Sequence, residues 1–518
     1  MPIVPVGVTN LSAVNVPNVL VQIVPPNPVI IGVPTNIGGV VGTATWGPVN
    51  SPVTIGTMQQ EVINFGNPQP VQYDLGTLVY AAIQQGANNF VCVRVTDGTD
   101  TAATTTLLDN QMTPVIGATL TAIYTGTVGN TLNAVVSQGS SYTESAPTIK
   151  LTIYLSGGVP EVFDNIGGTG ATLWDNLVSA VNLGQSTSRP PSQLVIATVG
   201  LSTHAASLTL YTFSGGTNGN SGVTTETLIG SDSDTPRTGM YALRGTLASV
   251  AALADATDTT YWTDQVAYGN SEGTYMIGAM AAGYQDNISG AQTLLQTAGI
   301  DNYNFKLPLG DWIQINDPFN NQSRFISPQG FALGEILVVS PAGSSLNKPM
   351  NGIVATQKTA EGRVYSQAEL QQIDNARLEV ITKPLPVGNV FGCRMGINTS
   401  SNPLTNTDNY PRMINFLAAS LNSQLGQFIG LPLTPDVVAD AYAAITTFLG
   451  GLADTSQPGG ALIDSNYAVT MDTNQGIGVL VANVQVPLFP ILQLFVTNLQ
   501  GNEGVTTQVL PPQLLQAS

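Results

Sequence analysis

The stretch VIIGVPTNIGGVVGTATWGPVN, residues 29–50, decides the fold of the first part of the chain. It is an apolar run interrupted by glycine and proline turns, and SPVTI (51–55) continues it. A helical pattern from Leu75 to Gln84 follows, and then the strand FVCVRV (90–95). Buried strands read as such continuous apolar runs between turn residues. We therefore predict that residues 29–96 form the first part of an α/β core.

Different patterns flank this core. Residues 1–28 form a proline-rich arm with one predicted strand, Asn18–Val24. Residues 97–214 are rich in Thr, Ser and Gly, and segments such as TLTAIYTG (119–126) alternate apolar and polar residues. This alternation predicts a β-rich barrel or sandwich domain inserted after the core.

Residues 215–384 combine both kinds of element. Helices are predicted at Tyr275–Tyr284 and Ser366–Ala376, and GEILVVS (334–340) is predicted to be a strand. We expect an α/β middle domain.

The C-terminal domain, predicted over residues 385–500, carries the clearest helix signals, and residues 501–518 form a tail. Asp408 or Asn409 is expected to cap a helix whose apolar residues recur every four positions. These residues are Met413, Leu417, Leu421 and Leu425. A second helix is expected to start at Thr434–Pro435 and to stop at Gly450–Gly451. Three predicted strands follow, at Tyr467–Asp472, Val479–Val486 and Ile491–Leu499.

Composition excludes several classes of protein. The 518 residues are 43% hydrophobic and only 9% charged, with a formal net charge of −18. Non-specific binding to nucleic acid or an anionic membrane needs a dense basic patch, which the sequence lacks. Cys92 and Cys393 are too far apart in sequence to suggest a zinc site or a disulfide framework. The N-terminus has no basic region typical of a signal peptide, and prolines and amides interrupt the apolar residues 478–496, so we expect no membrane insertion.

Charge is distributed unevenly along the chain. The first charged side chain is Glu61, and no Lys or Arg follows Arg412. Exposed edge strands are normally guarded by charged residues, because free N–H and C=O groups recruit other chains. Either both ends are buried in the chain's own sheets, or they pair with other molecules.

Candidate catalytic and ligand-binding motifs do not form complete sites. Gly269–Gly273 matches GxSxG, and QVAY (265–268) is predicted to be the strand before it. The sole histidine, His204, precedes Ser271, whereas a hydrolase of that class needs a histidine after the nucleophile. Loop 215–222 lacks the Lys-Ser/Thr ending of a phosphate-binding loop. A local group of acidic residues lacks the pattern of a calcium loop, namely Asp232, Asp234, Asp255, Asp258 and Asp264. We predict no catalytic, cofactor or metal site.

Several motifs together resemble the tail sheath proteins of contractile bacteriophages and contractile injection systems. Residues 16–55 are similar to that family's opening strand and its turn, seen here as Gly42–Pro48. AIYTGTVGNTLNAVV (122–136) and FSGGTNGN (213–220) resemble two of its loops, the second with Asn218 where the family usually has Asp. Further landmarks of the family match AAIQQGANNFVCVRV (81–95), SSLNKPMNGIVAT (344–356), NVFGCRMGINTSSN (389–402) and TDNYPRMINFLAASLNSQLGQFIG (407–430).

The resemblance implies a multidomain α+β subunit whose core sheet is completed by strands from neighbouring copies, with a subtilisin-like, non-catalytic middle domain. The implied exchanged residues are Val19, Leu20, Val21, Gln22 and Ile23 in the arm, and Ile491, Leu492, Gln493, Leu494, Phe495 and Val496 near the end. The implied tube-facing helix residues are Arg412, Asn415, Ser420 and Gln424. Sheath helices often carry adjacent basic residues, but here Arg412 is the only one between Arg394 and the end.

The implied function is a helical sheath of hexameric rings in the virion, assembled in the host cytoplasm, that contracts during genome ejection. The implied partners are further copies, the inner tail tube protein, and baseplate and tail terminator proteins, without nucleic acid or cofactors. A surface-layer or capsid-like shell protein is the alternative, and an enzyme with a degenerate hydrolase or subtilisin-like domain is a third.

Overall fold

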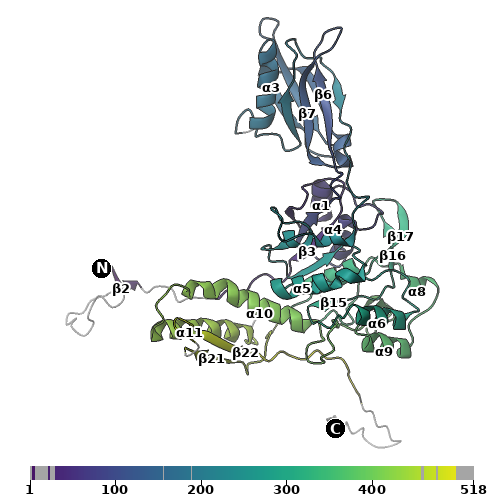
Figure 1. Cartoon of the computed structure of the whole chain (residues 1–518), viewed down its shortest axis with the longest axis vertical. Helices are drawn as coiled ribbons and strands as arrows, with labels where there is room; N and C mark the ends of the chain where they lie inside the picture. Colours follow the sequence, from purple (N-terminus) through teal and green to yellow (C-terminus); the bar gives the residue numbers. More distant parts are fainter. Residues whose placement is uncertain are drawn as a thin grey trace, which may run out of the picture. The chain divides into compact units, whose positions relative to one another are not determined.

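The computed structural model describes residues 3–5, 21–23 and 30–497, apart from residues 156, 188, 457–459 and 474–475. The chain forms two compact units, one made of Ile30–Ile429 and one made of Met1–Val29 with Gly430–Ser518. Helices and several separate sheets are present (Figure 1), which confirms the predicted mixed α+β class.

A six-stranded sheet is the centre of the larger unit. Its strand order is β15 (Phe305–Lys306), β14 (Tyr275–Ile277), β13 (Val250–Leu253), β3 (Gly38–Gly42), β5 (Phe90–Arg94) and β4 (Pro52–Ile55). All neighbours pair in parallel except β4, which runs antiparallel to β5. The predicted core strands in residues 29–55 and 90–95 are therefore confirmed.

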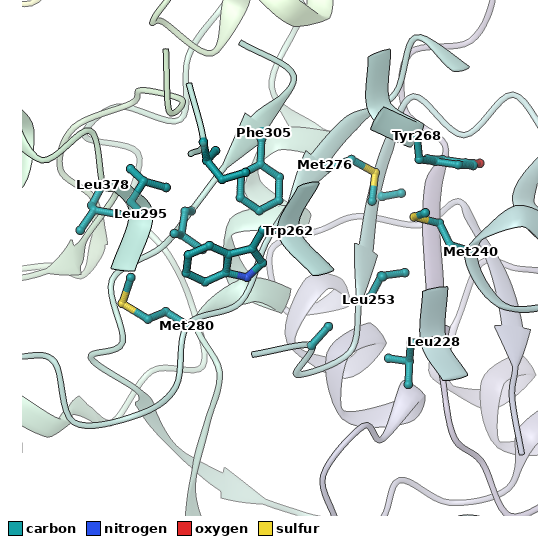
Figure 2. Packing of buried hydrophobic residues seen from close by; sticks show 14 of the residues in the cluster. Leu228, Met240, Leu253, Trp262, Tyr268, Met276, Met280, Leu295, Phe305 and Leu378 are labelled. Carbon is teal, nitrogen blue, oxygen red and sulfur yellow. The ribbon is translucent and has the colours of Figure 1, made fainter. Parts of the chain in front are cut away.

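Helices cover both faces of this sheet. On one face, α2 (Leu75–Ile83) and α7 (Gln329–Val338) pack with Val40, Phe90 and Ile277. On the other face, α5 (Trp262–Glu272), α6 (Ile288–Thr297) and α9 (Gln367–Asn375) contribute to a second core. Figure 2 shows Trp262 of that core beside Phe305. Burial on both faces explains why these strands read as apolar runs.

Residues 97–214 form a β-rich segment inserted between β5 and the rest of the core (Figure 1). One sheet has the order β11 (Val195–Val199), β7 (Ile116–Thr125), β6 (Ala102–Leu108). The other has the order β10 (Glu161–Gly167), β9 (Thr148–Tyr154), β8 (Asn133–Gln138), β12 (Leu210–Thr212). Both sheets and α3 (Ala171–Leu183) share one apolar core around the fully buried Trp174.

Shorter elements complete the larger unit, which ends with the long helix α10 (Asn409–Leu425). They are α1 (Met58–Phe65), α4 (Thr225–Ile229), α8 (Gln357–Ala360), β16 (Ile313–Asp317), β17 (Gln322–Ile326), β18 (Ala355–Thr356), β19 (Ile381–Thr382) and β20 (Gly392–Cys393).

The smaller unit contains α11 (Pro435–Leu452), which contacts a two-stranded sheet of β21 (Ala468–Asp472) and β22 (Val481–Gln485). Helix α11 starts after Thr434 as predicted, and the Thr434 hydroxyl caps it, but the helix runs through Gly450 and Gly451 to Leu452. This unit also holds β1 (Ile3–Pro5) and β2 (Val21–Ile23), which pair in parallel.

Three local predictions for the middle of the chain are wrong. GEILVVS lies mainly in helix α7, Tyr275 starts strand β14 instead of a helix, and QVAY lies in helix α5. Each segment is too short for its periodicity to separate a strand from a helix. Helix α9, with the Ser366 hydroxyl at its N-cap, is confirmed.

Candidate assembly site

The C-terminal segment of the described chain is apolar and exposed. The third predicted strand, Ile491–Leu499, forms no ladder within the described residues, which stop at 497. Leu492, Leu494 and Phe495 are 73%, 76% and 80% exposed. Leaving large apolar side chains in water costs about 1.5–3 kcal/mol each relative to full burial. The segment is therefore not part of a sheet of the described chain, and its pairing with another molecule stays a prediction.

The two preceding strands form a small sheet with open edges. β21 and β22 pair only with each other among the described residues, from Ala468 opposite Gln485 to Asp472 opposite Val481. This sheet contacts α11, and its unpaired outer edges can accept further strands. The two predicted strands here are therefore confirmed, and they offer edges next to the exposed segment in the sequence.

The predicted arm strand is described only in part. Val21, Gln22 and Ile23 form β2, with Val21 opposite Ile3 and Ile23 opposite Pro5. Val19 and Leu20 lie outside the described residues. The role of the arm in strand exchange stays a prediction.

Helix α10 holds the residues that the resemblance placed toward a tube. Arg412, Asn415 and Ser420 are buried, and Gln424 is half-buried. Arg412 Nη1 donates to Ser340 O at 2.9 Å, Asn415 Nδ2 donates to Asn304 Oδ1 at 2.8 Å, and Ser420 Oγ accepts from the Val33 amide at 3.1 Å. These three side chains fasten α10 to its own unit, so a tube contact through them would require breaking those bonds.

A buried charge network fixes the start of α10. Lys306 Nζ lies 2.7 Å from Glu379 Oε2 and 2.9 Å from Asp408 Oδ1, and the three side chains are at most 1% exposed. Asp408 also accepts from the Tyr275 hydroxyl at 2.8 Å and from Ser345 Oγ at 2.5 Å. Asp408 was predicted as a possible helix cap, but its carboxylate makes no cap hydrogen bond and serves this network instead.

Hydrogen bonds complete the network around Glu379. Its carboxylate accepts from four backbone N–H groups, those of Val380, Arg394, Met395 and Gly396, at 2.8–3.0 Å. Burial alone would raise the pKa of Asp408, but Lys306, Ser345 and Tyr275 lower it below its usual value. The arrangement is therefore an ion cluster stable in its charged form, joining β14, β15 and α10. Sequence reasoning missed it, because its members are far apart in the chain and no local motif marks them.

The GxSxG motif does not form a nucleophile elbow. Ser271 lies inside the end of α5, and its hydroxyl donates to Tyr268 O at 3.1 Å. A strand follows this helix, the reverse of the predicted order. His204 lies in the inserted segment, where its Nδ1 is 3.6 Å from Asp109 Oδ2. The motif is therefore part of a helix end, where Gly273 is the left-handed cap.

The described residues also lack a group of side chains for binding a metal ion and a helix for crossing a membrane. No group of three or more His, Cys, Asp or Glu side chains there could hold a metal ion. Of the acidic residues grouped in the sequence, Asp232 instead pairs with Arg237 at 2.8 Å and Arg244 at 2.5 Å. No helix within the described ranges has the length and apolarity needed to cross a bilayer.

The chain is similar to known proteins in structure, whereas its sequence gives no match. No protein-family model matches this sequence, and no curated protein matches it. A sheath tail protein from Listeria innocua is similar in structure, with a TM-score of 0.60, 14% identity, and coverage of 89% of this chain and 93% of that one. A sheath tail protein from Desulfitobacterium hafniense has a TM-score of 0.54 at 12% identity, covering 88% and 97%.

A third similar structure comes from an assembled particle. It is the sheath of an extracellular contractile injection system, the PVC sheath complex in its contracted state. Its TM-score is 0.52 at 9% identity, covering 94% of this chain and 98% of that one. The alignments span nearly the whole of each chain, so the likeness is not confined to one domain. The chain therefore has the fold of the tail sheath proteins of contractile systems.

Proposed function

We propose that this chain is the structural subunit of a contractile tail sheath. Copies would polymerise helically around an inner tube, in a virion or related particle assembled in the host cytoplasm. Contraction would then drive the tube through a host envelope. The observation that carries the proposal is the exposed, uncharged segment 491–497, which follows a two-stranded sheet with open edges.

The exposed segment supplies the contact between copies. Its backbone would add to the β21–β22 sheet of a neighbour, a mode of recognition known as β-augmentation. Each inter-subunit backbone hydrogen bond contributes about 0.5–1.5 kcal/mol net, so a strand of several residues gives a firm link when repeated through a polymer. The arm strand β2 is the second candidate for exchange.

The inner tube would meet α10 through neutral contacts. Arg412, Asn415 and Ser420 are held inside, whereas Asn422 and Ser423 of the same helix are exposed. Attachment would thus use uncharged polar groups instead of basic residues. Baseplate and tail terminator proteins would hold the two ends of the polymer.

Contraction needs no catalysis in this scheme. The extended lattice would be metastable, and subunits would rotate as near-rigid bodies into a shorter lattice with larger contacts when a baseplate triggers them. The exchanged strands would keep neighbouring copies linked during that rotation.

Proline substitution in the exposed segment tests strand addition. Proline removes a backbone donor from a ladder, and neighbouring N–H groups of a strand point to opposite sides. We therefore expect Gln493→Pro or Leu494→Pro, whichever removes the paired donor, to block formation of hollow tubes in negative-stain electron microscopy. Gln493→Ala and Leu494→Ala are the matched controls and should assemble like the wild type.

The monomer should be unaffected, because this segment forms no ladder within the described chain. Unchanged melting temperatures would show this. Tubes formed equally well by both proline variants would contradict strand addition. Flat sheets or closed shells of wild-type protein would instead support the surface-layer or capsid-like alternative.

A further inference from the structure

The inserted β-rich segment joins the core through a narrow region where four stretches of chain meet. We call it the neck, and it consists of residues 43–48, 94–101, 125–130 and 214–220. Backbone hydrogen bonds connect these stretches in pairs, such as Val128 N to Thr45 O at 3.3 Å and Asp97 N to Gly219 O at 2.7 Å. Three of the loops singled out in the sequence therefore come together at one place.

Arg94 lies at the centre of the neck. Its side chain is 0% exposed, and Nη1 donates to Gly47 O and Thr125 O, both at 2.7 Å. Nη2 donates to Asn218 O at 3.1 Å. These three carbonyls belong to the core turn, the inserted segment and the returning loop. The planar fork of a guanidinium can hold several acceptors in fixed directions, which an ammonium cannot do.

The cation stays charged in this site. Burial lowers the pKa of Arg94 to about 10, while Asp100 opposes that shift. The side chain is therefore protonated at neutral pH, and its hydrogen bonds to the three carbonyls are charge-assisted. Such bonds are shorter and stronger than hydrogen bonds between neutral groups.

Asparagine side chains add a second set of connections. Asn130 Nδ2 donates to Gly216 O at 2.9 Å, and the Gly216 amide donates back to Asn130 Oδ1 at 2.8 Å. Asn218 Oδ1 accepts from the Thr127 amide at 2.7 Å. An amide oxygen is sufficient for that contact, so the loop keeps its link to the inserted segment without the usual Asp.

The backbone segments of the neck approach each other too closely for the neck to act as a hinge. A Cβ on Gly126 (φ +128°) would lie 2.0 Å from Thr45 O. A Cβ on Gly216 would lie 2.3 Å from Gly126 O. Contacts this close leave no room for the two sides to slide past each other.

We propose that Arg94 is a positioning residue that locks the neck, so that the inserted segment and the six-stranded core move as one rigid body. The lock is a property of the single chain. Its consequence for a sheath rests on the proposed function: contraction would carry the inserted segment with the core, without a swing of its own.

Distance measurement between two spin labels tests the lock. Labels on Asp175→Cys of α3 and Gln296→Cys of α6 report on the two sides, and both positions are exposed. The native Cys92 and Cys393 are fully buried and should not react. We expect one narrow distance distribution for the otherwise wild-type chain and a broad or divided one for Arg94→Met. Arg94→Lys, which restores the charge but not the fork, should lie between them.

Arg189→Met is the matched control. Arg189 pairs with Glu161 at 3.6 Å inside the inserted segment, away from the neck, so its loss should leave the distribution narrow. An Arg94 role limited to general stability would lower the melting temperature of Arg94→Met but leave the distribution as narrow as in the wild type, and that result would overturn the proposal. A broad distribution in the wild type would overturn it as well.

Native-state proteolysis provides a second readout if Arg94→Met does not fold. Asn130→Ala keeps Arg94 but removes the reciprocal bonds to Gly216. Cleavage within the neck should rise about tenfold, the change that corresponds to loss of about 1.4 kcal/mol. Cleavage at the wild-type rate would count against the lock. Both measurements use the unassembled chain, so they remain decisive even if the protein forms no sheath.

Discussion

Replacing Lys306 by methionine should destabilise the protein strongly. The substitution keeps the apolar stem but leaves Glu379 and Asp408, which are at most 1% exposed, without the cation that lies 2.7 and 2.9 Å away. Removing one partner of a buried ion pair costs about 3–5 kcal/mol, because the remaining charge stays buried. We expect a loss of that size in the free energy of unfolding at pH 7.

Lys358→Met is the matched control for this substitution. Lys358 is equally buried, with 2% of its side chain exposed, and it lies 3.1 Å from Asp286 and 2.6 Å from Glu369. Those two carboxylates are 44% and 31% exposed, so water can solvate them when the cation is removed. Pairs of this kind contribute about 1 kcal/mol or less. The two variants should therefore differ by about 2–4 kcal/mol.

Urea unfolding of the unassembled chain, followed by tryptophan fluorescence, measures the difference. Trp262 is a suitable reporter because its ring centroid lies 6.3 Å from that of Phe305, the neighbour of Lys306. Lys306 helps to lower the pKa of the buried Asp408, so this pKa should be higher in Lys306→Met, and the deficit of the variant should shrink as the pH falls from 7 toward 5. Equal losses in the two variants, or a deficit independent of pH, would refute the reasoning.

Three further predictions concern pH, packing and salt. Burial raises the pKa of Asp74 from 3.8 to about 7, so its contribution to stability is present at low pH and is lost as the pH rises toward 7. Asp74→Asn, which cannot ionise, should flatten the pH dependence of the unfolding free energy by up to about 4 kcal/mol between pH 4 and 8. Gly334→Ala places a Cβ 2.5 Å from Ala82 O and should cost about 1–3 kcal/mol in thermal unfolding, whereas Gly426→Ala, with no atom within 4 Å, should cost nothing. Contraction of the proposed sheath, monitored by electron microscopy, should depend little on salt between 0.1 and 1 M. Strong inhibition by salt would contradict contacts through uncharged surfaces.

Sequence patterns predicted helices well where local chemistry marks the start of the helix. Helix α11 has Thr434 and Pro435 at its start, and α9 has the Ser366–Glu369 capping box. GEILVVS, most of which lies in helix α7, was predicted to be a strand. Its helical form depends on packing against α2, where Gly330 and Gly334 approach the Leu78 and Ala82 carbonyls. The local sequence GEILVVS does not predict that contact.

The same distinction applies to the candidate site, where local sequence reveals one part and not the other. The uncharged C-terminal segment could be found from composition, because absence of charge is visible residue by residue. The Lys306 network could not, since its charged partners lie 73 and 102 residues away. The tube-facing role of the α10 residues stays a prediction, although three of these side chains are buried. Arg412 stood out as an isolated cation, yet its isolation reflects burial, which lowers its pKa to about 10 while Asp408 opposes the shift.

The internal use of several basic residues bears on the proposed mode of assembly. Lys306, Arg94 and Arg412 are buried, and their hydrogen-bond donors hold parts of one chain together. Such cations cannot attract an acidic partner, and a chain with a net charge of −18 repels its own copies wherever acidic side chains face each other. In the proposed sheath, copies would then meet mainly through uncharged surface. The longest uncharged stretch near the end of the chain, residues 473–502, contains the exposed segment 491–497. Internal use of the cations therefore favours strand addition over ion pairing as the link between copies.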